Sequence, residues 1–127
     1  MICKIKPSTE TDLPHILELN KGAIPAVNFL NEPEILNLFS QAEYFHSLWL
    51  HQEVIGFLIA LGPGAIYNSP NYRWFELRYD QFLYIDRIVI DPAHQGLGYG
   101  RLFYDNLRES IERQFKKIAC EVNLRPK

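Results

Sequence analysis

The sequence predicts one α/β domain, with α and β elements layered in the order β-α-α-β-β-β-α-β. Three features support this fold class. Residues 82–90 form an almost continuous apolar run rich in β-formers, as expected of a central strand covered on both faces. Residues 44–51 and 54–61 predict two strands joined by a tight turn. After residue 98, apolar side chains recur at every fourth position, which predicts a helix. They are Phe103, Leu107, Ile111 and Phe115.

The N-terminal third predicts a strand followed by two helices. Residues 2–6 alternate between apolar and polar side chains. Residues 8–12 are rich in helix-capping side chains, and Pro14 suits the first turn of a helix that runs to about residue 21. A proline-bracketed connection then leads to a short second helix over residues 34–41.

The stretch 62–80 predicts a long loop that carries several aromatic side chains. Turn formers cluster between residues 68 and 71, and the aromatic content argues against disorder. We expect this loop to line a functional site or to cover the sheet. Residues 73–79 are also compatible with an extension of the next strand.

A helix over residues 98–115 and a strand over residues 117–123 complete the order. The segments 82–90 and 117–123 should be parallel neighbours joined by a right-handed crossover, which makes the sheet one of mixed direction. All of residues 1–127 are expected to form one domain.

Composition excludes several functional classes. The chain has 127 residues, is 47% hydrophobic and carries a net charge of −2, so phosphate-driven binding of nucleic acid has little support. No apolar run approaches the ~20 residues needed to cross a bilayer, and the start lacks the apolar block of a signal peptide. The histidines and cysteines lack metal-site spacing. We expect a cytoplasmic protein with no metal and no nucleic-acid or membrane partner, and we leave open a homodimer.

The most informative segment joins the apolar strand to the last helix. The strand stops at Asp91 and Pro92, and three glycines at alternate positions, Gly96, Gly98 and Gly100, then open the helix. Glycines allow close approach of a ligand, and the N–H groups of a helix N-terminus attract phosphate. The spacing fits neither a Walker A loop nor the GxGxxG dinucleotide fingerprint. Glycines that serve only tight helix packing are the alternative.

The run from Gln95 to Gly100 resembles the Q/R-x-x-G-x-G/A motif of the GCN5-related N-acetyltransferases (GNAT) at every defined position. The lead-in over residues 88–92 is similar to strand 4 of that family, and the order of elements is similar through strand 5. The resemblance implies acetyl-coenzyme A as co-substrate. It assigns backbone N–H groups of the loop to the pyrophosphate and the strand backbone to the pantetheine arm, with the N–H of Ile88 polarising the thioester carbonyl. The residues so assigned are Ile88, Val89, Ile90, Gln95, Gly96, Leu97, Gly98, Tyr99, Gly100 and Arg101.

The catalytic assignment rests on two strand residues. Well-known family members have a glutamate base in strand 4, and the matching position here is Tyr84, a poor base near neutral pH. Asp86 lies two residues further on, so simple alternation puts it on the same face as Tyr84 and Ile88. Either Asp86 lines the active-site cleft, or it forms a structural pair with Arg87, Arg73 or a loop N–H. Glu121 is a weaker candidate.

The resemblance implies an N-acetyltransferase that passes the acetyl group directly to a primary amine of a small molecule or peptide. Cys120 lies in an apolar segment that offers nothing to activate it as a covalent nucleophile. Two alternative functions remain open. One is a non-catalytic acyl-CoA-binding or interaction module, and the other is a binder of another phosphate ligand. Family members continue past strand 5 with a helix and two strands, so we expect a C-terminally short domain or one completed by another chain.

Overall fold

A computed structural model describes residues 3–111 of the chain, with the side chain of Ile111 excepted. Four strands form one antiparallel sheet in the order β1-β2-β3-β4. Their bounds are Cys3–Pro7, Tyr44–Leu50, Glu53–Leu61 and Tyr84–Ile90. The predicted turn between β2 and β3 is confirmed, and His51 adopts a φ of 59° there. The strand expected over residues 117–123, and the parallel pairing that depends on it, lie outside the described residues.

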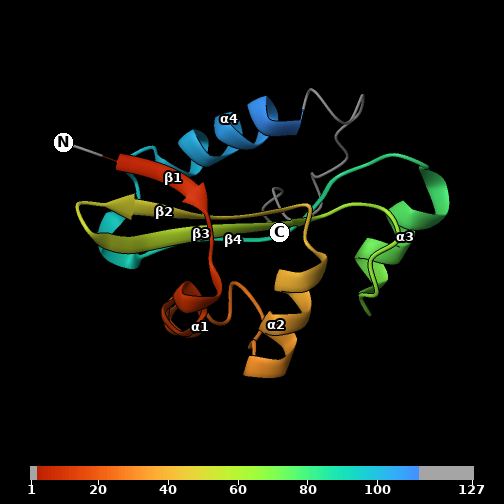
Figure 1. The fold of residues 1–127 in the computed structure, drawn as a ribbon, viewed down its shortest axis with the longest axis horizontal. Coiled ribbons are helices and arrows are strands. Elements are labelled where there is room, and N and C mark those ends of the chain that lie inside the picture. The colour runs from red at the N-terminus through yellow and green to blue at the C-terminus, as the bar shows by residue number, and fades with distance from the viewer. Residues whose placement is uncertain (1–2, 112–127) are drawn as a thin grey trace.

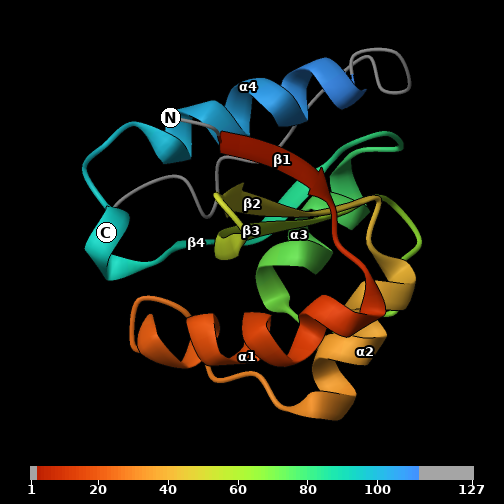
Figure 2. The same ribbon diagram turned by 60° about the vertical axis from the view of Figure 1, so that its left-hand side comes forward.

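The sheet is the middle of three layers (Figure 1). Helix α4 (Tyr99–Ile111) covers one face, and helices α1 (Leu13–Gly22) and α2 (Glu32–Gln41) cover the other, as Figure 2 shows from a second angle. Each face has its own apolar cluster, one centred on Ile16, Ile35 and Phe57 and the other on Leu48, Leu58 and Phe103. Because β3 lies between both clusters, every residue from Val54 to Leu61 is buried.

The helix starts follow from local chemistry. Pro14 lies in the first turn of α1, as expected. Helix α2 begins two residues earlier than predicted because Asn31 caps it. The Asn31 side chain accepts the N–H of Glu34 at 2.9 Å, and the Glu34 carboxylate accepts the N–H of Asn31 at 2.9 Å. Short 3-10 turns at Glu10–Asp12 and Pro92–His94 precede α1 and α4.

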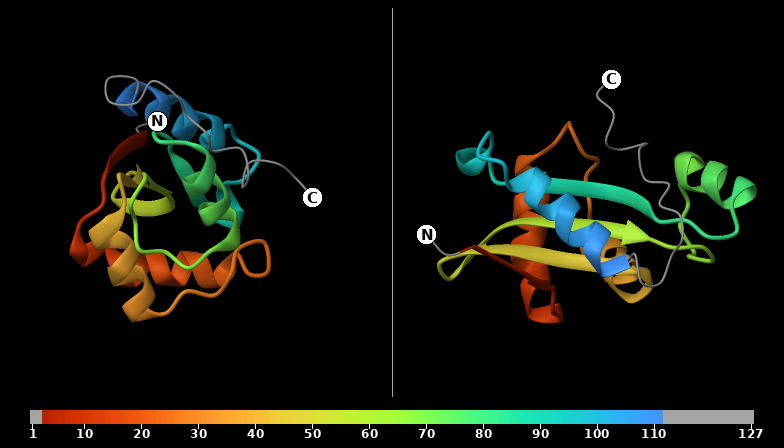
Figure 3. Two further views of the ribbon diagram at one scale, coloured as in Figure 1. Left: turned by 90° about the vertical axis from the view of Figure 1, so that its right-hand side faces the viewer. Right: turned by 90° about the horizontal axis from the view of Figure 1, so that it is seen from above.

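The prediction of an irregular loop over residues 62–80 is wrong in its second half. Residues Pro70–Arg78 form helix α3, which lies at one end of the sheet (Figures 1 and 3). The side chain of Ser69 accepts the N–H of Tyr72 at 3.3 Å, and Pro70 occupies the first turn, so the cluster of turn formers is a helix cap. Tyr72 and Phe75 anchor the helix in the core, which also excludes an extended strand over residues 73–79.

Candidate functional site

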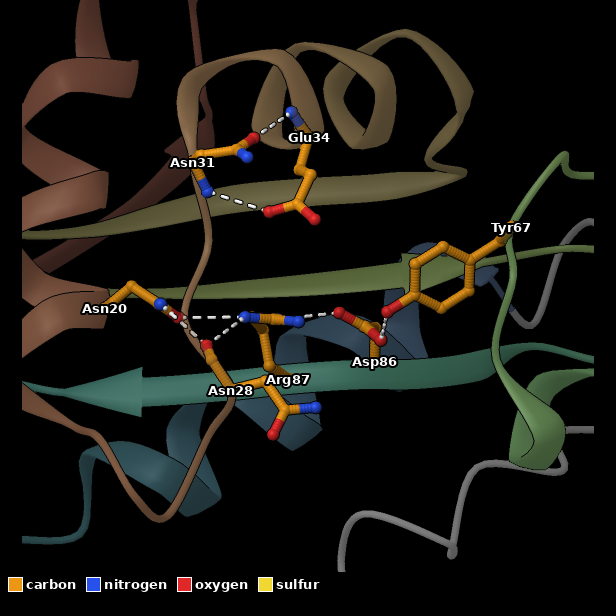
Figure 4. Close-up of polar contacts among 7 residues, drawn as sticks. All are labelled: Asn20, Asn28, Asn31, Glu34, Tyr67, Asp86 and Arg87. Carbon is orange, nitrogen blue, oxygen red and sulfur yellow. Dashed lines mark hydrogen bonds and ion pairs between the residues drawn. The ribbon is translucent and has the colours of Figure 1, made fainter.

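Strand β4 carries a β-bulge at Asp86. Ile59 of β3 lies opposite Arg87, but the next residue, Ala60, lies opposite Ile85. One residue of β4 is therefore extra in the ladder, and its side chain is turned toward that of its neighbour. Asp86 and Arg87 consequently project together toward the α1 and α2 side of the sheet (Figure 4).

The bulge changes which side chains share a face. Tyr84 belongs to the cluster beneath α1 and α3, on the side to which Asp86 also points. Ile88 packs instead with the cluster beneath α4. The expectation that Asp86 shares a face with Ile88 is wrong, because one inserted residue reverses the alternation beyond it.

A buried ion pair forms the centre of the site. The Nε of Arg87 donates to Oδ2 of Asp86 at 2.7 Å, and the two side chains are 7% and 5% exposed. Burial by itself would lower the pKa of Arg87, but the charge and hydrogen bond of Asp86 raise it above its ordinary value. Of the two roles considered for Asp86, the structural pair with Arg87 is thus present, and the same side chain also lines a cleft.

Each member of the pair reaches a different loop. Nη1 of Arg87 donates to Oδ1 of Asn20, on α1, and to the carbonyl of Asn28, after α1, both at 3.1 Å. Asn20 donates to the same carbonyl at 3.0 Å. On the other side, the hydroxyl of Tyr67 donates to Oδ1 of Asp86. Burial, followed by the charge of Asp86, raises the pKa of Tyr67, so its hydroxyl stays protonated. Two loops that are far apart in sequence are therefore joined through adjacent residues of β4 (Figure 4).

These loops and β4 form a cleft of about 430 Å³. One wall is the α1–α2 connection and the other is the segment that leads into α3. The residues that line it are Ala26, Val27, Asn28, Tyr67, Asn68, Ser69, Pro70, Asn71, Tyr84, Asp86, Arg87 and Ile88. A second hollow beside α2 shares Asn28, Tyr67, Asn68 and Arg87 with the cleft. Its lining also includes apolar side chains, among them Phe29 and Ile66. The loop expected to line a functional site therefore does line a cleft.

The glycine loop lies at the opposite end of β4. Gly96 and Gly98 adopt φ angles of 78° and 89°, the left-handed region in which glycine is favoured. A Cβ placed on either residue, or on Gly100, would meet no described atom within 4 Å. Tight packing against residues 3–111 therefore does not explain the three glycines. The side-chain amide of Gln95 donates to the carbonyl of Ile90 at 3.0 Å and ties the loop to the end of β4.

Helix α4 starts immediately after Gly98, and Gly100 lies in its first turn. The N–H of Leu102 makes an early helical bond to the carbonyl of Gly98 at 3.1 Å. The first N–H groups of a helix have no partner within the helix itself. In this protein they follow Gly96 and Gly98, which have no Cβ that could block a ligand from the backbone. Leu97 is exposed, whereas Tyr99 is buried and anchors the helix start on the sheet. The loop therefore has the shape and polarity of an anion cradle.

Sequence reasoning missed Asn20 and Asn28 as members of the site, whereas Tyr67 belongs to the aromatic loop that was expected to line a functional site or to cover the sheet. A signal for Asn20 exists, since it continues the apolar stripe of Leu13 and Ile16 on α1 with a polar, 1% exposed side chain. No local pattern marks Asn28, whose main-chain carbonyl is the group used. Cys120 and Glu121 lie outside the described residues. Among residues 3–111, no cluster of side chains suited to a metal is found, and no helix is long and apolar enough to cross a membrane.

The sequence from residue 13 to residue 125 matches the profile of the Acetyltransferase (GNAT) family. No curated protein is similar enough in sequence to match the chain. Since the match spans most of the 127 residues, the chain belongs to the GNAT acetyltransferase family.

Solved structures agree with this fold at low sequence identity. Ribosomal-protein-alanine N-acetyltransferase from Brucella melitensis biovar Abortus 2308 is 15% identical with a TM-score of 0.69, covering 94% of this chain and 79% of that one. Naa50 from Arabidopsis thaliana, in complex with the bisubstrate analogue CoA-Ac-MVNAL, is 12% identical with a TM-score of 0.68, covering 93% and 70%. N-acetylglutamate synthase from Neisseria gonorrhoeae, complexed with coenzyme A and N-acetyl-glutamate, is 15% identical with a TM-score of 0.63, covering 88% of this chain but 23% of that one.

Proposed function

We propose that this protein binds acetyl-coenzyme A with the loop between β4 and α4 and transfers the acetyl group to a primary amine. In this proposal the amine is held in the cleft beside β4, hereafter the acceptor cleft. The observation that carries the proposal is the glycine loop. Gly96 and Gly98 have positive φ angles, and a Cβ at either of them or at Gly100 would meet no atom of the described residues within 4 Å. Such backbone before the N-terminus of a thirteen-residue helix suits a pyrophosphate.

The proposed path of the coenzyme follows β4. Residues Gln95 to Arg101 would hold the pyrophosphate through backbone N–H groups. Ile88, Val89 and Ile90 would pair with the pantetheine arm through the main chain, because β4 is the outer strand of the sheet formed by residues 3–111. The thioester would then lie beside Ile88, a residue that also lines the acceptor cleft. Relatives in this fold have been solved with coenzyme A or its conjugates, which supports the same ligand here.

The proposed reaction is a direct acyl transfer. The amine nitrogen attacks the thioester carbonyl carbon, the C–S bond breaks, and the proton lost by the amine balances the one gained by the thiolate. We assign Asp86 to accept a hydrogen bond from the amine and so orient it, and Tyr84 to assist through its hydroxyl. Both residues line the cleft.

One observation favours the non-catalytic alternative. Both carboxylate oxygens of Asp86 already accept hydrogen bonds, from Arg87 and from Tyr67. If this is the whole role of Asp86, the domain would bind an acyl-CoA without turning it over. Release of coenzyme A in the presence of a panel of amines distinguishes an enzyme from a binding module.

Thermal melting with acetyl-CoA, CoA, ATP and NAD tests the ligand. Either form of coenzyme A should stabilise the fold by about 2.7 kcal/mol at a hundredfold excess over Kd, and ATP and NAD should not. Gly98→Ala should abolish most of this shift. Gly64→Ala is the matched control, because Gly64 also has a positive φ of 83° and an open Cβ position but lies in another loop. A clear shift with ATP or NAD and none with CoA would refute the proposal.

A further inference from the structure

The segment between β3 and α3 is held in place by side chains of two helices. The N–H groups of residues 64 and 65 donate to side chains of α3, at 3.0 Å and 2.9 Å. The N–H of the next residue, Ile66, donates to Oε1 of Gln41, the last residue of α2, at 2.6 Å. Three consecutive main-chain donors are therefore bound by side chains, and one wall of the acceptor cleft takes its shape from α2 and α3.

Gln41 binds both main-chain groups of Ile66. Besides accepting the N–H, its side-chain amide donates to the carbonyl of Ile66 at 3.0 Å. The same Nε2 also donates to Oδ1 of Asn37, one turn earlier on α2, at 2.9 Å. Asn37 in turn donates to the carbonyl of Ile66 at 3.3 Å. The amide of Gln41 has one orientation only, because the reversed amide would set its NH₂ group against the N–H of Ile66.

Burial of its side chain does not hold Ile66 in this position. The side chain is 81% exposed, so the hydrophobic effect stabilises the placement of this residue very little. The hydrogen bonds from Gln41 and Asn37 are therefore what fix the main chain here.

The next residue carries this placement into the acceptor cleft. Tyr67 lines the cleft, and its hydroxyl donates to Oδ1 of Asp86 (Figure 4). Its ring also packs edge-on against Tyr72, with centroids 5.9 Å apart, which restrains the plane of the ring. The hydroxyl lies at the far end of the side chain, so a small rotation of the main chain displaces it by more than a hydrogen bond tolerates. Its direction therefore depends on how firmly residue 66 is held.

We propose that Gln41 is a positioning residue of the acceptor site. It acts through the main chain of Ile66 and the hydroxyl of Tyr67 to orient the carboxylate of Asp86, and it is not among the described residues that line the cleft. This inference rests on the proposed function, from which the cleft takes its acceptor role. Orientation matters there because a displacement of about 1 Å can lower a rate by about a hundredfold.

The test follows the Tyr67 hydroxyl by NMR of protein labelled with ¹³C at the hydroxyl-bearing carbon of tyrosine. Tyr67→Phe assigns the resonance by removing it. Gln41→Leu keeps the approximate size of the side chain but makes neither bond to Ile66. The Tyr67 resonance should therefore move toward that of free tyrosine, and amide hydrogen exchange at Ile66 should accelerate by roughly tenfold.

Three further measurements show whether the effect is local. Tyr44, whose hydroxyl donates to a side chain of α4 on the other face of the sheet, should keep its resonance in Gln41→Leu. Gln52→Leu, at an exposed position in the β2–β3 turn, is the matched control and should leave the Tyr67 resonance unchanged. Gln41→Asn is one methylene shorter and should move the Tyr67 resonance in the same direction, so it replaces Gln41→Leu if that variant does not fold.

Melting with acetyl-CoA separates failure of this inference from failure of the proposed function. The shift in Gln41→Leu should equal that of the parent, because the glycine loop lies at the opposite end of β4. No shift in the parent refutes the proposed function, while the Tyr67 resonance still decides whether Gln41 orients Asp86. An unmoved resonance, even with a lower melting temperature, overturns the positioning role and shows that the contact with Tyr72 suffices. A moved resonance with a normal acetyl-CoA shift supports both.

Discussion

The guanidinium of Arg87 donates to the carboxylate of its chain neighbour Asp86 at 2.7 Å, and through this bond the two walls of the acceptor cleft are connected. Arg87 holds the carbonyl of Asn28 on one wall, and Asp86 holds the hydroxyl of Tyr67 on the other. Neighbouring residues of a regular strand point to opposite faces, so this contact depends on the bulge in β4. The ion pair therefore links the two walls of the cleft, and its two opposite charges offset each other.

Breaking this pair from either side should destabilise the fold. We expect Asp86→Asn or Arg87→Met to reduce the free energy of unfolding by about 3 kcal/mol, because each leaves a buried polar partner uncompensated. The double variant should lose less than the sum of the two, with a coupling of about 1–3 kcal/mol. Denaturant unfolding of all four proteins measures the cycle. Full activity in Asp86→Asn together with a large drop in stability would remove the proposed catalytic role of Asp86.

Removing the Tyr67 hydroxyl should affect the acceptor more than the coenzyme. Tyr67→Phe keeps the ring but deletes the bond to Asp86, so stability should fall by about 1.5 kcal/mol and the acceptor KM should rise several-fold. The thermal shift with acetyl-CoA should stay as in the parent protein. Tyr79→Phe, at a 39% exposed position beyond α3, serves as the control. An equal change in coenzyme affinity and acceptor KM would show that the loop acts only by keeping the whole domain folded.

Gly100→Ala should separate stability from coenzyme binding. Gly100 lies in the first turn of α4 and has no positive φ, and a Cβ on it would meet no atom of residues 3–111 within 4 Å. Alanine there should raise the free energy of unfolding by up to about 1 kcal/mol, because alanine is the better helix former. If the pyrophosphate approaches this backbone, the same methyl group should weaken CoA binding at least tenfold. Calorimetric titration and melting of one variant measure both effects, and unchanged CoA affinity would contradict the proposed cradle.

Stability should fall on mild acidification because of His46. Burial lowers the pKa of this side chain to about 4, its ring stacks on Tyr44 with centroids 3.8 Å apart, and its Nδ1 has no hydrogen-bond partner among the described residues. The neutral form is therefore favoured in the folded state, while the unfolded chain takes up a proton near pH 6.5. The contribution is fully present above about pH 6.5 and is lost as the pH falls toward 4. His46→Phe should flatten the dependence of the melting temperature on pH in this window, and an unchanged slope would show that other groups cause it.

The strand-to-helix segment with its glycines could be predicted from sequence because its determinants are local. An apolar run, Pro92 and alternate glycines fix the backbone within a few residues, and the same holds for the turn at His51. Helix α3 was missed because Ser69 and Pro70 are equally good as turn formers and as a helix start. Burial of Tyr72 and Phe75 in the core favours the helix, and that depends on residues distant in sequence.

The sequence by itself determined the order of elements in the described part except helix α3, together with the glycine loop before α4, since periodicity and backbone preference are properties of short segments. Only the tertiary structure decided which residues come together in the acceptor cleft. The bulge at Asp86 arises from the register of β4 against β3, and it turns Asp86 and Arg87 to one side. Arg87 then hydrogen-bonds to Asn20 and Asn28, and Asp86 hydrogen-bonds to Tyr67. The partners are separated by up to 67 residues along the chain. Strand register and long-range contacts of this kind are set by packing of the whole core, which no local pattern of residues encodes.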